Sequence, residues 1–110
     1  MALTLETTQS GDAYVAKIIG ESLETDNVAM FRTAIAPVLD RSKSIVLDLS
    51  LVGFMDSTGL GAMLSCLRSV KAKGGTLKLT NLTPEVRQLF EMVLMDRVFE
   101  IYPDVASALS

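Results

Sequence analysis

The residues best placed to do chemistry lie in one short segment, residues 53–61, between an apolar run typical of a strand and a run typical of a helix. Two hydroxyl groups, those of Ser57 and Thr58, follow the carboxylate of Asp56 there. In open α/β sheets, function commonly lies where strands end and helices begin. Ser57 can also be nothing more than a helix N-cap, because a serine hydroxyl accepts a free backbone N–H at that position. The position alone leaves both interpretations open.

Several kinds of catalytic chemistry are excluded by residue types that the chain lacks. There is no His, so a Ser-His-Asp triad and His-ligated metal sites are out. The single cysteine, Cys66, can form neither an internal disulfide nor a thiolate zinc site. Gly59 and Gly61 are not phosphate-loop glycines, because the pattern GxxxxGK[ST] is absent. We therefore expect no enzyme activity, no metal and no cofactor.

The helix predicted after this segment has an unusual outer face. Glycine is unfavourable in a first helical turn, so Gly59 and Gly61 indicate close approach by another group. If the leucines face the core, small neutral residues face outward where Glu and Lys would be ordinary. Either a partner docks on this face, which we favour, or a further layer of the domain covers it. The residues concerned are Thr58, Gly61, Ala62, Ser65, Ser69 and Ala72.

Other candidate residues are weaker. Asp48, near a strand end, resembles the phospho-acceptor of a receiver domain, but Lys78 lies within its strand rather than at its end, so a structural role is favoured. Cys66 is expected to be a buried filler. Met92 and Met95 are expected to pack rather than to form a binding patch.

Composition limits the remaining possibilities. A chain of 110 residues with 49% hydrophobic and 5% aromatic residues predicts one domain, residues 1–110, with an aliphatic core. A net charge of −3 without a basic cluster argues against a nucleic-acid partner. No apolar run approaches the ~20 residues that span a bilayer, and no signal-peptide core is present, so we expect a cytoplasmic protein without membrane insertion.

Strand and helix patterns alternate along the chain and predict an α/β fold with a mainly parallel sheet of four to five strands, an N-terminal antiparallel hairpin and about four helices. The first helix is expected to begin with a cap at Thr25 or Asp26 and to kink or stop near Ala36, because Pro37 removes a hydrogen bond. The expected strands are residues 3–8, 14–19, 45–49, 76–80 and 98–101, and the further helices are residues 58–73, 84–94 and 103–109.

Two stretches together resemble a known family. Ile45-Val46-Leu47-Asp48-Leu49-Ser50 followed by Phe54-Met55-Asp56-Ser57-Thr58-Gly59-Leu60-Gly61 is similar to the signature of bacterial anti-sigma-factor antagonists, the STAS domain family. The predicted order of elements fits that fold along nearly the whole chain. The Asp-Ser-Thr-Gly-Leu-Gly run at a strand–helix junction is the specific part of the resemblance.

The resemblance implies a regulatory role. In this family an anti-sigma factor acting as an ATP-dependent serine kinase phosphorylates the motif serine, which corresponds to Ser57, with Thr58 as the second choice. The unphosphorylated protein binds that kinase and releases its other client, commonly a sigma factor, and a PP2C-type phosphatase restores the serine. The implied partner-binding residues are Glu21, Leu23, Asp56, Ser57, Thr58, Gly59, Gly61, Ala62 and Ser65.

Some expectations stay open. Family members often carry a Gly-Glu-Leu-Asp-like run after the second strand, whereas residues 20–26 have an extra residue, so the acid at the family's Asp position is not assigned. The alternative function is a small accessory subunit docking on the ATPase of a lipid-trafficking ABC transporter. The identity of the kinase and of the output, nucleotide binding and the oligomeric state are not determined; we expect a monomer when the chain is free.

Overall fold

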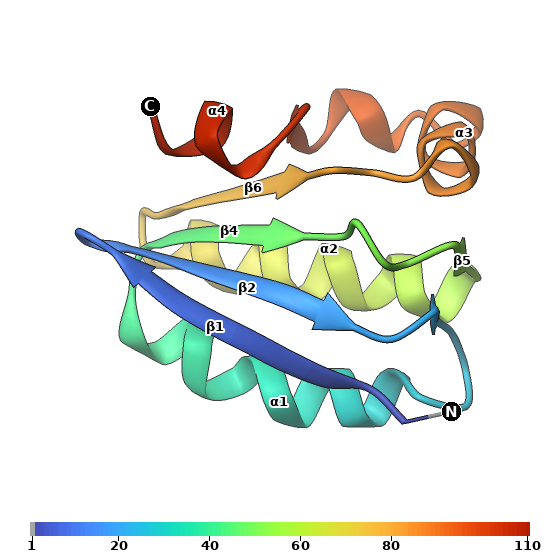
Figure 1. Ribbon diagram of the computed structural model, residues 1–110, viewed down its shortest axis with the longest axis horizontal. Helices are drawn as coiled ribbons and strands as arrows, with labels where there is room; N and C mark the ends of the chain where they lie inside the picture. The colour runs from blue at the N-terminus through green and yellow to red at the C-terminus, as the bar shows by residue number, and fades with distance from the viewer. Residues whose placement is uncertain (1) are drawn as a thin grey trace.

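A mixed sheet begins with an antiparallel hairpin of β1 (Thr4–Ser10) and β2 (Ala13–Ile19) in the computed structural model, which describes residues 2–110 (Figure 1). Three strands continue the sheet in parallel beyond β2: β4 (Ser44–Asp48), β6 (Thr76–Thr80) and β7 (Glu100–Tyr102). The strand order β1-β2-β4-β6-β7 leaves β1 as an open edge. The predicted mainly parallel sheet with an N-terminal hairpin is confirmed.

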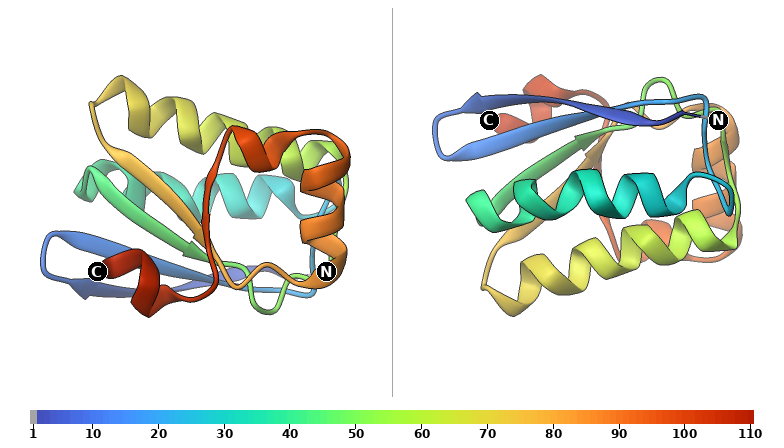
Figure 2. Two further views of the ribbon diagram at one scale, coloured as in Figure 1. Left: turned by 90° about the horizontal axis from the view of Figure 1, so that it is seen from above. Right: turned by 90° about the horizontal axis from the view of Figure 1, so that it is seen from below.

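Helices cover the two faces of this sheet unequally. Figure 2 shows the two long helices, α1 (Val28–Arg41) and α2 (Ser57–Ala72), side by side on one face. The short α4 (Val105–Leu109) lies on the other face, where Lys78 of β6 donates to the Ala108 carbonyl at 2.9 Å. The remaining helical elements, α3 (Pro84–Met92) and the 3-10 turn η1 (Met95–Arg97), lie between β6 and β7 in the chain.

A second, two-stranded sheet lies apart from the main one. β3 (Ser22–Leu23) pairs in parallel with β5 (Phe54–Met55), and neither is among the expected strands. A strand of two residues has too little pattern to be recognised from sequence. The pair joins the segment after β2 to the segment before α2, which positions the candidate site.

The core is aliphatic, as the composition predicts, and its centre is β4. Ile45, Val46 and Leu47 are all buried because helices lie on both faces of that strand. The face toward α1 and α2 holds the larger cluster. Its helical members are Phe31, Ile35 and Val38 from α1, and Ala62, Met63, Cys66, Leu67 and Val70 from α2.

The early stop near Ala36, one of the two outcomes expected at Pro37, and the expected N-cap of α1 are wrong. The helix does not stop near Ala36 but continues to Arg41, because Pro37 lies on an exposed flank while Ile35 and Val38 stay buried on either side of it. The N-cap is Asn27 rather than Thr25 or Asp26. The buried Asn27 side chain accepts from the Glu24 N–H at 2.9 Å and donates to the Ser22 carbonyl at 2.8 Å, so it orders the preceding loop instead of closing the helix end.

Among residues 2–110, no helix is both long and apolar enough to cross a membrane.

The central position of β4 generates a stability prediction. Leu47→Ala should lower the free energy of unfolding by about 2–5 kcal/mol, because the fully buried side chain leaves a cavity between sheet and helices. Urea denaturation followed by circular dichroism measures the change. Met92→Ala is the control, since Met92 is 73% exposed and its truncation should stay within about 0.5 kcal/mol. Equal costs at the two positions would contradict the assigned core.

Candidate functional site

The N-terminus of α2 is held against the loop that follows β2. Beside the β3–β5 pair, the Gly53 N–H donates to the Glu21 carbonyl at 2.9 Å. These backbone bonds join residues 21–23 to residues 53–56, although some thirty positions separate the two segments in the chain. The first turn of α2 therefore has a fixed position relative to the loop.

Asp56 is the N-cap of α2, and its carboxylate is fully occupied. One oxygen, Oδ1, accepts from the Gly59 N–H at 3.0 Å and from the Thr58 hydroxyl at 2.5 Å. The other, Oδ2, accepts from both the backbone N–H, at 3.1 Å, and the hydroxyl, at 3.0 Å, of Thr25. Sequence reasoning had placed the cap at Ser57, and the structure moves it to Asp56.

These hydrogen bonds hold the pKa of the Asp56 carboxyl well below its usual range, with the bond from the Thr58 hydroxyl as the largest cause and that from the Gly59 N–H next. No Lys or Arg contributes to the lowered pKa. Asp56 is therefore a negative charge stabilised by hydrogen bonds alone, next to the two candidate hydroxyls.

The two hydroxyls differ sharply in their surroundings. Ser57 is the first helical residue and is exposed, and among residues 2–110 no hydrogen bond involves its hydroxyl. The Thr58 hydroxyl donates to Asp56 and lies 3.0 Å from the Thr25 hydroxyl oxygen. Of the two, Ser57 has the hydroxyl that is available to another molecule.

Gly59 and Gly61 have different roles. Gly59 is buried against the loop: a Cβ there would fall on the Leu23 carbonyl oxygen and within 2.8 Å of Met55 Cγ. At Gly61 a Cβ would meet nothing within 4 Å. Of these two glycines, Gly59 is the one required by close approach inside the domain.

The implied partner-binding residues do not all reach the surface. Leu23 and Ala62 are 0% and 1% exposed, and Gly59 is also buried, so these three lie beneath the surface rather than on it. The expectation that Ala62 faces outward is wrong. The residues with exposed area are Glu21, Asp56, Ser57, Thr58, Gly61 and Ser65, called the Ser57 surface below.

Part of the small-residue face packs within the domain. Ala62, Ser65 and Ser69 border a shallow groove whose opposite wall is α1, with Arg32 and Ala36. The small side chains let the two helices come close there, so this part of the face meets α1 of the same layer rather than a further layer of the domain. The exposed members of this face are Thr58 in the first turn, beside Ser57, and Ser69 and Ala72 toward the end of the helix.

Sequence reasoning missed Thr25 as a site residue. Thr25 was considered only as a helix cap, whereas its N–H and hydroxyl both bond Asp56, 31 positions away. No local pattern indicates such a contact. The run of residues 20–26 thus supplies a threonine to the Asp56 carboxylate.

Asp48 and Cys66 have structural roles, as expected, whereas Met92 is 73% exposed, so the expectation that it packs is wrong. Asp48 Oδ1 accepts from the Ser50 N–H at 3.0 Å and from Asn81 Nδ2 at 3.2 Å, which ties the ends of β4 and β6 together. Cys66 is buried, as expected, and burial raises the pKa of its thiol to about 11. Within residues 2–110, no group of three or more His, Cys, Asp or Glu side chains could hold a metal ion.

Comparison with known proteins agrees with this architecture. The model of the STAS domain family matches residues 4–108, so the chain belongs to that family.

Three relatives illustrate the similarity. The chain is 28% identical to the anti-sigma-B factor antagonist of Bacillus subtilis, over 92% of each chain. It is 26% identical to the anti-sigma factor antagonist SpoIIAA in its unphosphorylated form, with a TM-score of 0.63 over 88% of this chain and 97% of the other, and 23% identical to the phosphorylated form from Bacillus, with a TM-score of 0.70 over 96% of each. An anti-sigma factor antagonist from Mycobacterium paratuberculosis shares the fold with a TM-score of 0.83 at 24% identity, over 98% of this chain and 92% of the other.

The two glycines make a matched pair for testing the packing of α2 on the loop. Gly59→Ala should lower the free energy of unfolding by more than 1 kcal/mol, because the new Cβ would overlap backbone at Leu23. Gly61→Ala should raise it by up to ~1 kcal/mol, because alanine is the better helix former and the space is open. Urea denaturation of both variants measures the two changes in the free energy of unfolding. The same sign for both would contradict the close contact between Gly59 and Leu23.

The lowered pKa of Asp56 predicts acid sensitivity. A carboxyl whose pKa is depressed by folding contributes stability at neutral pH, and that stability is lost as the pH falls below about 4. Asp56→Asn should be less stable than the parent chain at about pH 7 and should lose less stability between about pH 5 and about pH 2. Asp104, whose pKa is lowered by the Ser107 N–H, keeps part of the slope in both proteins. Thermal unfolding of both proteins across this pH range measures the loss of stability. Parallel pH profiles would refute the lowered pKa of Asp56.

Proposed function

We propose that this protein is an anti-sigma factor antagonist that binds a cognate anti-sigma serine kinase through the Ser57 surface and is switched off by phosphorylation of Ser57. The observation that carries the proposal is the contrast at the first turn of α2. The Ser57 hydroxyl is exposed and unbonded, while the neighbouring Thr58 hydroxyl is held by Asp56. A kinase can reach the first without disrupting the site.

A phosphate on Ser57 is compatible with the fold. It adds about −1.5 to −2 charges at the N-terminus of a 16-residue helix, where free backbone N–H groups and the helix dipole favour an anion. None of the hydrogen bonds to Asp56 involves the Ser57 side chain, so the contact between the loop and α2 need not break. The modified protein is expected to keep its structure.

The same phosphate would disfavour the binding of a partner. The phosphate would stand beside the charged Asp56 carboxylate, and no Lys or Arg acts on that carboxylate. Covering the two anions with a partner surface would strip their water without supplying a counter-charge, at a cost of several kcal/mol. Since each 1.4 kcal/mol is tenfold in affinity, phosphorylation would be enough to release the complex.

The relatives support this cycle. SpoIIAA is known in an unphosphorylated and a phosphorylated form, and the relatives reported above are anti-sigma factor antagonists. In the proposed cycle the anti-sigma factor transfers the γ-phosphoryl group of ATP to Ser57, and a PP2C-type phosphatase removes it. The chain is substrate and ligand in this cycle and catalyses neither step. The transporter-accessory alternative is not favoured by these relatives.

A binding series tests the switch. The probe is the purified anti-sigma factor kinase of the same genome, titrated by calorimetry without ATP. Ser57→Asp should weaken binding at least about tenfold through uncompensated charge, and Ser57→Ala should stay within about twofold. Ser69→Asp, which puts the same charge on an exposed position of the same helix, is the matched control and should also stay within about twofold. Equal affinity of Ser57→Asp and Ser57→Ala would refute the proposal.

A further inference from the structure

The edge strand β1 is unprotected. It is seven residues long, it pairs with β2 without a bulge from Thr4 to Ser10, and six of its residues are exposed. It contains no Pro, Lys or Arg, and Glu6 is its one charge. Natural edge strands are commonly blunted by such residues, because their outward N–H and C=O groups are ready to pair with another strand.

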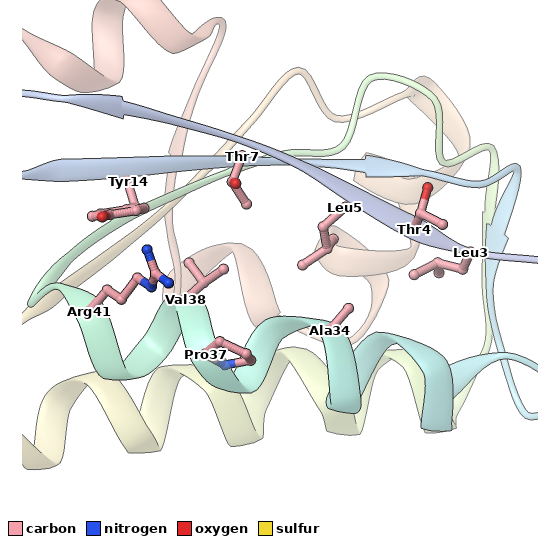
Figure 3. A pocket seen from close by; sticks show the side chains of 9 residues that line it. All are labelled: Leu3, Thr4, Leu5, Thr7, Tyr14, Ala34, Pro37, Val38 and Arg41. Carbon is pink, nitrogen blue, oxygen red and sulfur yellow. The ribbon is translucent and has the colours of Figure 1, made fainter.

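A groove of about 390 Å³ runs between β1 and α1, directly beside this edge. Figure 3 shows Leu5 and Thr7 of β1 facing Ala34 and Val38 of α1 across it. The groove therefore lies along the inner face of the sheet at its β1 edge. Alternate side chains of an added strand would enter the groove, while its backbone would pair with β1.

One end of the groove carries a positive charge. Arg41, in the last turn of α1, lies at the end near Tyr14 and Thr7, and Leu3 lies at the other end (Figure 3). Among residues 2–110, no ion pair joins Arg41 to an acid. The groove thus has apolar walls and one unpaired cation.

We propose that this groove takes an extended peptide segment of a partner protein, added to the sheet beside β1, with apolar side chains at every second position and an Asp or Glu next to Arg41. A small amphipathic acid would fill the groove but leave the backbone groups of β1 unpaired. A second copy of β1 would bring no carboxylate, because Glu6 alternates with Leu5 and Thr7 and so lies on the opposite face of the strand. The peptide alone satisfies the edge, the apolar walls and Arg41.

The groove is separate from the Ser57 surface, with which it shares no residue. Binding there goes beyond the proposed switch: it would bring the protein to a second partner whether or not Ser57 carries a phosphate. Ser57→Asp is therefore expected to leave peptide binding unchanged.

Two synthetic peptides are the probes: acetyl-Asp-Thr-Val-Thr-Val-Thr-Val-amide for antiparallel addition and the reversed sequence for parallel addition. Each is titrated to millimolar concentration into the ¹⁵N-labelled protein. We expect one of them to shift the amide signals of β1 and of the α1 flank and to slow hydrogen exchange of β1 amides. Arg41→Glu should weaken that peptide about fivefold, and replacing its Asp by Lys should restore binding to the variant.

Matched variants and a competing probe make the result decisive. Ala34→Gln fills the groove and should abolish binding, whereas Ala36→Gln, on the α2 side of the same helix, should not; thermal unfolding verifies that both fold. No shift with either peptide, or shifts confined to the Ser57 surface, would overturn the proposal. So would octanoate binding in the groove more tightly than the peptides, or a dimer in sedimentation whose formation protects the β1 amides.

Discussion

The whole site depends on how one carboxylate is satisfied. Asp56 caps α2 and accepts hydrogen bonds from both the helix and the loop, so the same charge orders two segments that are distant in sequence. The capping bond to Gly59 is local, and the bonds from Thr25 are tertiary. By engaging the Thr58 hydroxyl as well, Asp56 leaves Ser57 as the one hydroxyl of the motif that faces solvent unbonded. The cap of α2, the contact between the loop and α2, and the difference between the two hydroxyls thus all depend on the Asp56 carboxylate.

The sheet gives this arrangement its rigidity. The parallel strands β2 and β4 run in register, so the segments that follow them leave the same end of the sheet and can meet as β3 and β5. Gly59 then lets α2 begin in contact with the loop, where a side chain would collide with Leu23. The proposed electrostatic switch requires a rigid site, because a phosphate on Ser57 would then act on the partner rather than on the fold.

The sequence predicted those features that local patterns encode. The expected strand over residues 45–49 is β4, whose apolar residues are buried, and the expected helix from residue 84 is α3, which Thr83 caps. Contacts between distant segments could not be predicted. Thr25 reaches Asp56 across 31 positions, and Leu23 is buried by a strand pair too short to leave a pattern. Pro37 wrongly indicated an early end of α1. Tertiary packing of the helix on both sides of this residue outweighs the local penalty of a proline.

Localising the phosphate tests the central claim most directly. The purified anti-sigma factor kinase and ATP would be incubated with the parent chain, with Ser57→Ala and with Thr58→Val, and the products analysed by tandem mass spectrometry of intact chains and peptides. The account predicts one phosphate, on Ser57, in the parent chain and in Thr58→Val, and none in Ser57→Ala. A phosphate on Thr58 of the parent chain, or undiminished incorporation in Ser57→Ala, would contradict it, because the hydroxyl held by Asp56 would then be the reactive one.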